Sequence, residues 1–142
     1  GERMARELED FYGTPLTQFT MSLYEACLTQ AFSHDGWGKL AFDFSKHDRG
    51  LIVVRAKEAI FAGLAAKAKA PVDTLLGAVL AGVLSAVSGQ QLDCVQTACQ
   101  ACGAAEGVFV IALADRLAKV ADWPTRGKSH DEVVEALEAT AA

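Results

Sequence analysis

The chain has 142 residues and a formal net charge of −5, and 51% of its residues are hydrophobic but only 8% are aromatic. This composition excludes an intrinsically disordered chain, which would be poor in apolar residues. The acidic balance argues against nucleic-acid binding and against binding to an anionic membrane surface, because both require a basic field. We expect a single domain over residues 1–142, since this length supports a substantial hydrophobic core.

The sequence also predicts the cellular compartment. The apolar run from Leu75 to Val87 is interrupted by Ser85 and is shorter than the roughly 20 residues that span a bilayer, so no membrane insertion is expected. The first residues carry both signs of charge and lack the apolar segment of a signal peptide. Four cysteines are too few for a disulfide scaffold in a chain of this size. We therefore expect a cytoplasmic protein with free thiols.

The first part of the chain predicts helices and then a β-hairpin. Residues 4–33 form a helical region: a short helix ends at Gly13, and Thr14 with Pro15 is typical of the start of a second helix that runs to residue 32. Apolar residues alternate with other residues over 39–45, which predicts a half-buried strand. The β-branched segment 51–55 predicts a second strand, and the turn between them suggests that the two pair.

The second part predicts a central helix, another hairpin and more helices. Residues 57–69 are alanine-rich and weakly helical, whereas residues 75–88 are apolar on nearly every side and predict a buried central helix that ends at Gly89. Strands are expected over 92–100 and 107–113, and a short helix over 115–120. Ser129 and Glu132 have the spacing of a capping box and predict the start of a final helix.

These elements predict an α+β fold. Two close strand pairs indicate a four-stranded antiparallel sheet made of two hairpins, because a parallel sheet would need a crossover helix after each strand. The buried central helix and the flanking helices are expected to pack on one face of that sheet.

Three cysteines lie close together in the sequence, at Cys94, Cys99 and Cys102. Their spacing is shared with some iron–sulfur proteins, but the fourth thiolate that such a cluster needs is missing downstream, and strand alternation would place Cys94 and Cys99 on opposite faces. Cys99 and Cys102 could bind zinc with Cys94 or a histidine. A redox dithiol would need a helix to begin after the pair. Free thiols that pack as small apolar groups are favoured over an iron–sulfur cluster, a zinc site and a redox dithiol. No cofactor is therefore expected.

The histidines, Trp37 and the small residues of the apolar helix form no catalytic motif. His34, His47 and His130 lie in predicted turns or at a helix start, without a neighbouring nucleophile, and we expect them to be exposed. Trp37, between two glycines, is expected to close one end of the core or to contact a ligand. Small residues such as Gly77 either leave room for an apolar cavity or allow close packing of helix on sheet.

Three segments together resemble a known family. They are the apolar helix of residues 71–89 with its glycines, the strand of residues 92–103 with its cysteines, and residues 107–111 after a glycine. They resemble the 4-vinyl-reductase-type, hydrocarbon-binding domain, and the likeness covers roughly residues 36–114. It leaves an N-terminal helical region over 4–33 and a C-terminal helical extension over 115–142. The family implies a sandwich of helices and sheet akin to subunits of the vesicle-tethering TRAPP complex, a homodimer and an apolar pocket.

The same resemblance implies zinc beside the pocket in some members of the family. This chain departs from that pattern, because Gln96 stands at the glutamate position and Gly107 at a cysteine position, and only Cys99 is retained. A neutral amide and a glycine do not replace two anionic ligands. We therefore expect the family's metal site to be missing here.

A second resemblance concerns the predicted hairpin. Residues 36–45 and 51–54 are similar to the small cytoplasmic subunit of bacterial cellulose synthase. That family implies a related fold and a closed, ring-like oligomeric scaffold without catalysis.

The sequence thus leads to two hypotheses of different classes. The first is a non-catalytic, dimeric and regulatory domain that binds a small hydrophobic ligand. Its expected ligand contacts are Trp37, Phe61, Gly77, Ala81 and Phe109. The alternative is a structural subunit of a bacterial secretion or cellulose-synthesis machine that forms a closed oligomer. Reductase or other enzyme activity is the least supported, because no acid–base pair, nucleophile or cofactor motif is present.

Overall fold

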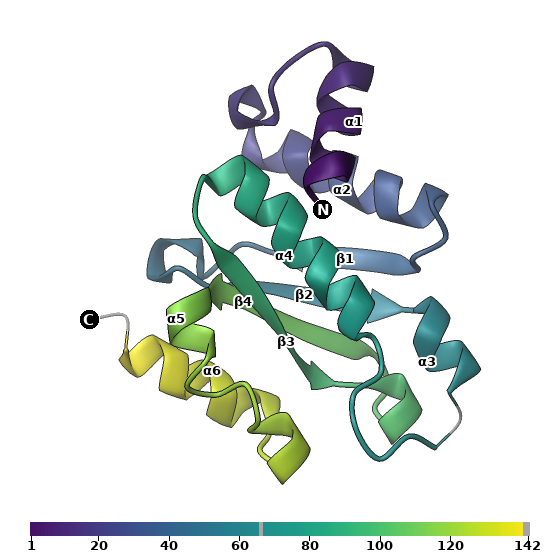
Figure 1. Ribbon diagram of the computed structural model, residues 1–142, viewed down its shortest axis with the longest axis vertical. Helices are drawn as coiled ribbons and strands as arrows, with labels where there is room; N and C mark the ends of the chain where they lie inside the picture. The colour runs from purple at the N-terminus through teal and green to yellow at the C-terminus, as the bar shows by residue number, and fades with distance from the viewer. Residues whose placement is uncertain (66, 141–142) are drawn as a thin grey trace.

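A four-stranded antiparallel sheet forms the centre of the computed structural model, which describes residues 1–65 and 67–140 (Figure 1). The strands are β1 (Lys39–Asp43), β2 (Ile52–Lys57), β3 (Leu92–Ala98) and β4 (Gly107–Leu113). Their spatial order is β1-β2-β4-β3, so the two predicted hairpins are present and join where β2 pairs with β4. The predicted α+β class is confirmed.

One face of the sheet is covered by the N-terminal helices and by the central helix (Figure 1). These elements are α1 (Glu2–Tyr12), the 3₁₀ turn η1 (Leu16–Gln18), α2 (Met21–His34), the short α3 (Ile60–Leu64) and α4 (Thr74–Ser88). Helix α4 crosses β3, α1 packs on α4, and α2 packs along β1. The first hydrophobic core lies between this layer and the sheet.

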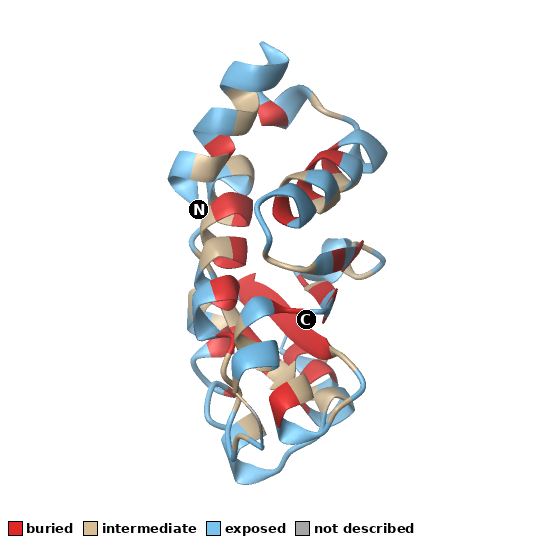
Figure 2. Ribbon diagram, turned by 90° about the vertical axis from the view of Figure 1, so that its right-hand side faces the viewer, coloured by how far each residue is buried: buried red, intermediate tan, exposed pale blue. Residues whose placement is uncertain are grey.

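Helices also cover the opposite face, which corrects the expectation of a single helical layer. A second core joins β3 and β4 to α5 (Ala114–Leu117) and α6 (His130–Ala139), through buried residues such as Val110, Leu117 and Leu137. The reason is visible in β4, where every residue from Gly107 to Ala112 is buried. A strand that is apolar on both faces must be covered on both faces. Figure 2 shows the buried residues on the strands and on the inward sides of the helices.

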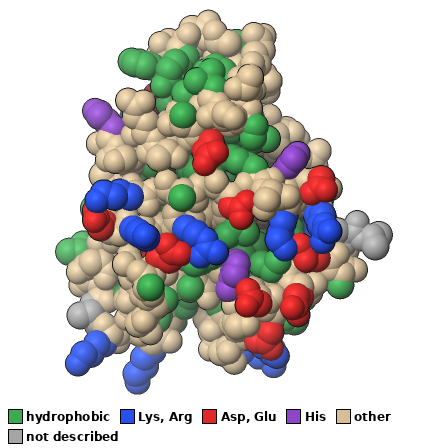
Figure 3. Space-filling view, turned by 180° about the vertical axis from the view of Figure 1, so that it is seen from behind, with side chains coloured by type: hydrophobic (Ala, Val, Ile, Leu, Met, Phe, Trp, Pro, Cys, Tyr) green, Lys and Arg blue, Asp and Glu red, His purple; other side chains and the backbone are tan. Residues whose placement is uncertain are grey.

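The rest of the second face is polar. Figure 3 shows a band in which side chains of both charges alternate across the middle of the molecule. Lys39 of β1 pairs with Glu58 at 2.9 Å, and Arg55 of β2 pairs with Glu106 at 2.7 Å. The C-terminal layer therefore covers β3 and β4, whereas Ala41 of β1 and Arg55 of β2 are exposed on the outer face and Val53 of β2 is buried there.

Helix α4 is central, but it is buried on one side rather than all round. Leu76, Leu80 and Leu84 are buried against the sheet, whereas Leu75 is 52% exposed. Gly89 adopts a left-handed conformation and ends the helix as predicted. Within the described residues, no helix combines the length and the apolarity that crossing a membrane requires.

The second helix begins later than predicted. Pro15 has an extended ψ of 135° and leads only into η1, and α2 starts at Met21. The Thr20 hydroxyl accepts a hydrogen bond from the backbone N–H of Leu23, at 3.3 Å, and so caps this helix. The later start places a corner of the chain over the end of the sheet.

The helix predicted over 57–69 is also shorter than expected, and residue 66 lies outside the described residues. Only Ile60–Leu64 are helical. Glu58 and Lys67 have φ values of 57° and 58°, a left-handed conformation that interrupts a right-handed helix at each end. The predicted strand over 92–100 ends at Ala98, after a bulge between Gln96 and Ala98. The predicted capping box of Ser129 and Glu132 is confirmed at the start of α6.

Candidate functional site

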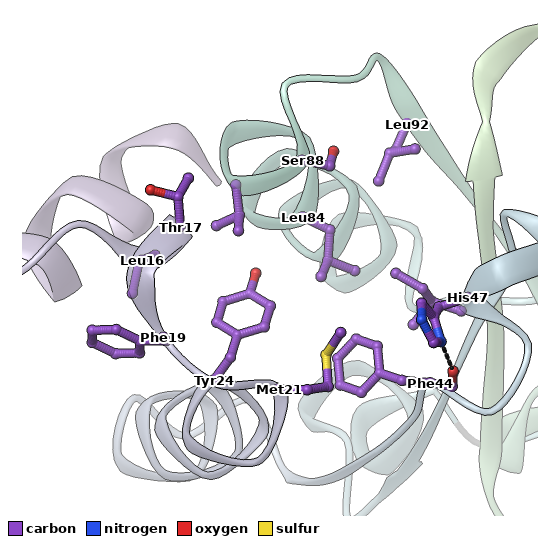
Figure 4. A pocket seen from close by; sticks show the side chains of 12 residues that line it. Leu16, Thr17, Phe19, Met21, Tyr24, Phe44, His47, Leu84, Ser88 and Leu92 are labelled. Atoms are coloured by element: carbon purple, nitrogen blue, oxygen red, sulfur yellow. Dashed lines mark hydrogen bonds between the residues drawn. The ribbon is translucent and has the colours of Figure 1, made fainter.

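An apolar pocket lies where the corner between η1 and α2 meets the end of α4 and the sheet (Figure 4). Its volume is about 320 Å³. Most of its lining side chains are apolar, and they come from helices, turns and strands that are far apart in the sequence. The lining residues are Leu16, Thr17, Phe19, Met21, Tyr24, Phe44, His47, Ile52, Leu84, Val87, Ser88 and Leu92.

Three parts of the fold build the walls of this pocket. Met21 and Tyr24 project from the first turns of α2, and Leu84 projects from the last turns of α4 (Figure 4). The third wall is aromatic: the Phe44 ring lies 6.3 Å from the Tyr24 ring and 6.0 Å from the Phe42 ring, centroid to centroid. The late start of α2 is what places its first turn over this space.

Tyr24 carries the polar group of the pocket wall. Only 6% of the residue is exposed, and its hydroxyl has no hydrogen-bond partner within the described part of the chain. Burial raises the pKa of Tyr24 above its ordinary value, because the charged phenolate would lose its hydration. The hydroxyl therefore stays protonated at neutral pH and can donate a hydrogen bond.

The other polar groups lie at the rim. Thr17, His47 and Ser88 are exposed residues that also line the pocket. The Nδ1 atom of His47 lies 2.7 Å from the Phe44 carbonyl oxygen. Because a carbonyl can only accept, Nδ1 donates the hydrogen bond, and in the neutral ring Nε2 is left as an acceptor. The lining thus offers apolar surface, three hydroxyls and one imidazole, without a carboxylate or a thiol among its described residues.

The two other histidines have different surroundings. His34 is exposed, as predicted. His130 is half-buried rather than exposed, because its Nδ1 lies 2.9 Å from the Thr97 hydroxyl on β3. This burial lowers the pKa of His130. The contact links the first turn of α6 to the sheet.

The five residues predicted to contact a ligand lie elsewhere, on α3, α4, β4 and the segment before β1. Phe109 is fully buried in the first core, and Ala81 is buried on α4. The half-buried rings of Trp37 and Phe61 lie 6.5 Å apart at another end of the sheet. The structure brings these two together but does not place any of the five in the pocket lining. Their role in binding stays a prediction.

Gly77 shows what the small residues of α4 do. A Cβ atom at this position would lie 3.2 Å from the Cys94 sulfur and 3.8 Å from Cδ1 of Phe109. The glycine therefore allows close approach of α4 to β3 and β4, which was the alternative to an open cavity. The Cys94 thiol is buried by this contact, and burial raises its pKa.

A buried polar cluster ties the start of α4 to β3. The two carboxylate oxygens of Asp73 accept hydrogen bonds from the Ala62 N–H at 3.1 Å and from the Gln96 side-chain amide at 3.0 Å. The Asp73 backbone N–H donates to the Gln96 side-chain oxygen at 3.0 Å. The Cys99 sulfur lies 3.9 Å from the same carboxylate. Asp73 therefore begins α4 without capping it, because its side chain serves this cluster instead.

The cluster also corrects the expected orientation of the cysteines. Cys94 contacts Gly77 and Cys99 contacts Asp73, one helical turn away on α4, so both thiols face the same helix. The bulge between Gln96 and Ala98 shifts the register and reverses the expected alternation. Cys102 is exposed, and desolvation together with its neighbours Cys99 and Asp73 raises the pKa of its thiol.

These residues do not fit the zinc site that the family resemblance implies. Zinc binds thiolates, imidazoles and carboxylates, whereas Gln96 is a neutral amide and both oxygens of Asp73 already accept hydrogen bonds. Within residues 1–65 and 67–140, no group of three or more His, Cys, Asp or Glu side chains could hold a metal ion.

The pocket residues themselves were missed by sequence reasoning. Leu16, Phe19 and Phe44 carried an apolar signal, but it indicated core rather than a site. One signal was available: Tyr24 places a polar group on the apolar side of a predicted helix, where such a group needs a partner.

Comparisons with known proteins support the fold. No known protein family matches the sequence, and no curated protein matches it. Among solved structures, a vinyl-4-reductase family protein from Methanocaldococcus jannaschii superposes with a TM-score of 0.55 at 17% sequence identity. The match covers 76% of this chain and 66% of that chain, slightly less than two thirds of its length. The chain therefore has the 4-vinyl-reductase-type fold.

Proposed function

We propose that this chain is a non-catalytic domain that binds one small hydrophobic molecule in the pocket between η1, α2, α4 and the sheet. The observation that carries the proposal is an apolar pocket of about 320 Å³. This volume lies within the range of about 300–1,000 Å³ that is typical of small-molecule sites. The shared fold supports the same proposal.

The lining favours an uncharged, largely apolar ligand. Leu16 and Leu84 are buried, and Phe44 and Ile52 are half-buried, so an occupant would contact mostly hydrocarbon. Each methylene group transferred from water to such a site contributes about 0.8 kcal/mol. A charged ligand would lose its hydration without gaining a buried partner of opposite charge.

Binding without turnover is supported by the chemistry of the lining. Within the described residues, His47 is hydrogen-bonded to the Phe44 carbonyl through Nδ1, and neither of its ring nitrogens is hydrogen-bonded to the hydroxyl of Thr17 or Ser88. A nucleophile would need such a base within reach of its hydroxyl. We also propose that binding needs no metal, since Gln96, which stands where the family has a glutamate, is a neutral amide that is hydrogen-bonded to Asp73.

A fluorescent probe tests this proposal. Phenylnaphthylamine is uncharged, and its fluorescence intensity increases in apolar surroundings. We expect saturable binding at one molecule per chain. Ser88→Trp should lower the affinity by about tenfold or more, which corresponds to about 1.4 kcal/mol, because the indole would fill the pocket from its rim. Bound probe should also raise the unfolding temperature of the wild type.

Thr74→Trp is the matched control, since Thr74 is likewise an exposed residue of α4 but lies at its other end. This variant should bind the probe as the wild type does. Absence of saturable binding to the wild type, or equal weakening by both substitutions, would contradict the proposed pocket.

We further propose that the domain acts as a homodimer with a regulatory role. Large apolar side chains remain on its surface, above all Phe11, which is 80% exposed, and Leu64, which is 79% exposed. Native mass spectrometry tests this: a dimer that carries a lipophilic adduct supports the proposal. A large closed oligomer without an adduct would favour the structural assembly subunit instead. A cytoplasmic location stays a prediction of the sequence.

A further inference from the structure

Among the described residues that line the pocket, Tyr24 is the one whose side-chain polar atom is buried in the core. The Tyr24 side chain belongs to the first hydrophobic core together with Leu16 and Leu84. Figure 4 shows it pointing into the space that Thr17 and Leu84 frame. Solvent does not reach the hydroxyl, and within the described residues it has no partner.

An unpartnered buried hydroxyl is unusual and destabilises the free protein. Buried side-chain polar atoms in native proteins are in large majority hydrogen-bonded, and each exception calls for an explanation. A phenylalanine at this position would fill the same space beside Phe44 without a desolvated oxygen. The hydroxyl is therefore best explained by a partner that is present only when the pocket is occupied.

We infer that the natural occupant is not a pure hydrocarbon but an apolar molecule with one hydrogen-bond acceptor oxygen, which accepts from the Tyr24 hydroxyl. Carbonyl, ester and ether oxygens belong to this class. The inference rests on the proposed function, since it concerns the ligand of the same pocket. It adds a specificity-determining residue to a site whose other buried contacts are apolar.

The geometry sets a condition for this contact. The hydroxyl is covered in the free protein, so the side chains around it must move before a ligand oxygen reaches it. Rotamer changes of this kind are common on binding and leave the backbone in place. The rim groups of Thr17, His47 and Ser88 remain open to water and would contact the opposite end of the ligand.

The test uses two probes of the same shape. Acetylnaphthalene has a ketone, and isopropenylnaphthalene has a C=CH₂ group in place of C=O at the same ring carbon. Each probe displaces phenylnaphthylamine from the wild type, from Tyr24→Phe and from Tyr12→Phe. The wild type should prefer the ketone by about three- to tenfold after correction for the partition of each probe out of water. Tyr24→Phe should remove this preference, and Tyr12→Phe should retain it, because Tyr12 does not line this pocket.

An infrared measurement reports the bond itself. A hydrogen bond lowers the stretching frequency of a carbonyl group, so the bound ketone should absorb at lower frequency in the wild type than in Tyr24→Phe. Free Tyr24→Phe should unfold at the same or a higher temperature than the free wild type, because it loses the unpartnered hydroxyl. A purely structural role for Tyr24 would move neither the carbonyl band nor the preference between probes.

The outcomes separate this inference from the proposed function. Equal affinity of the wild type for both probes, with a carbonyl band that Tyr24→Phe leaves unchanged, overturns the inference and leaves apolar binding in place. Failure of both probes and of phenylnaphthylamine to bind the wild type overturns the proposed function, and the inference with it.

Discussion

Asp73 is fully buried, and the neighbouring groups determine whether that burial is tolerated. Its carboxylate accepts from the Ala62 N–H and from the Gln96 amide, while Gln96 in turn accepts from the Asp73 backbone. A buried charge without such partners would cost several kcal/mol. Gln96 therefore stabilises the buried aspartate in two ways: its side-chain amide donates to the Asp73 carboxylate, and its side-chain oxygen accepts from the Asp73 backbone N–H.

Gln96→Glu tests this interpretation at the scale of one residue. The substitution replaces an amide donor, 3.0 Å from the Asp73 carboxylate, with a second carboxylate. We expect a loss of about 3 kcal/mol in the free energy of unfolding at pH 7. Because two adjacent carboxylates retain a shared proton, the folded variant would bind more protons than the unfolded chain. Stability therefore falls as pH rises, and the loss should shrink towards pH 4.

Gln91→Glu is the matched control, since Gln91 is exposed just before β3. Urea unfolding at several pH values measures both variants against the wild type. A loss for Gln96→Glu that stays constant between pH 4 and pH 7 would contradict the proposed repulsion between carboxylates.

At the scale of one element, α2 illustrates how two local signals compete for a helix start. Thr14 with Pro15 and Thr20 both offer an N-cap residue, and the sequence pattern favours the first. The structure uses Thr20, because Leu16 instead donates its backbone N–H to the Glu9 carboxylate at 2.9 Å. That bond spans seven residues and ties η1 to α1, and the later start of α2 leaves Leu16 and Phe19 outside the helix, where they line the pocket.

Two alanine substitutions distinguish the two helix starts. Thr20→Ala should lower the free energy of unfolding by about 1 kcal/mol, because the Leu23 N–H would lose its side-chain acceptor. Thr14→Ala should leave stability nearly unchanged. Chemical denaturation followed by circular dichroism measures both. The reverse order of effects would place the start of the helix at Pro15.

At the scale of the whole molecule, the sheet lies between two hydrophobic cores. Phe109 and Ile111 of β4 point into the first core, and Val110 and Ala112 point into the second. The C-terminal helices are therefore part of the folded core and not an appendage on its surface. Arg116 connects them further, since it donates to backbone carbonyl oxygens of Arg49 and of Leu137.

Truncation of the second core measures how much it contributes. Leu137 of α6 is 1% exposed, and Leu137→Ala should cost about 2–5 kcal/mol through lost burial and the cavity that remains. Leu64→Ala removes the same atoms from an exposed position on α3 and should change stability by less than about 0.5 kcal/mol. Urea unfolding that showed equal effects would mean that α6 does not stabilise the fold.

Much of the fold could be predicted from the sequence, because its signals are local. The alternation in residues 39–45, the turn at residues 47–50 and the spacing of Ser129 and Glu132 each involve residues that are close together in the chain. Strand pairing within each hairpin follows from such short connections. The family resemblance rested on the same local patterns, and the shared fold confirms what it implied about architecture.

The site is different, because its residues become neighbours only in three dimensions. The pocket draws on residues from Leu16 to Leu92, and the Asp73–Gln96 contact spans 23 residues. Neither leaves a pattern within one helix or one strand. The sequence by itself determined the strands, the hairpins and the apolar central helix, since hydrophobic periodicity and turn chemistry act over a few residues. Only the tertiary structure decided where Tyr24 lies and that its hydroxyl lacks a partner, because packing between distant segments sets both.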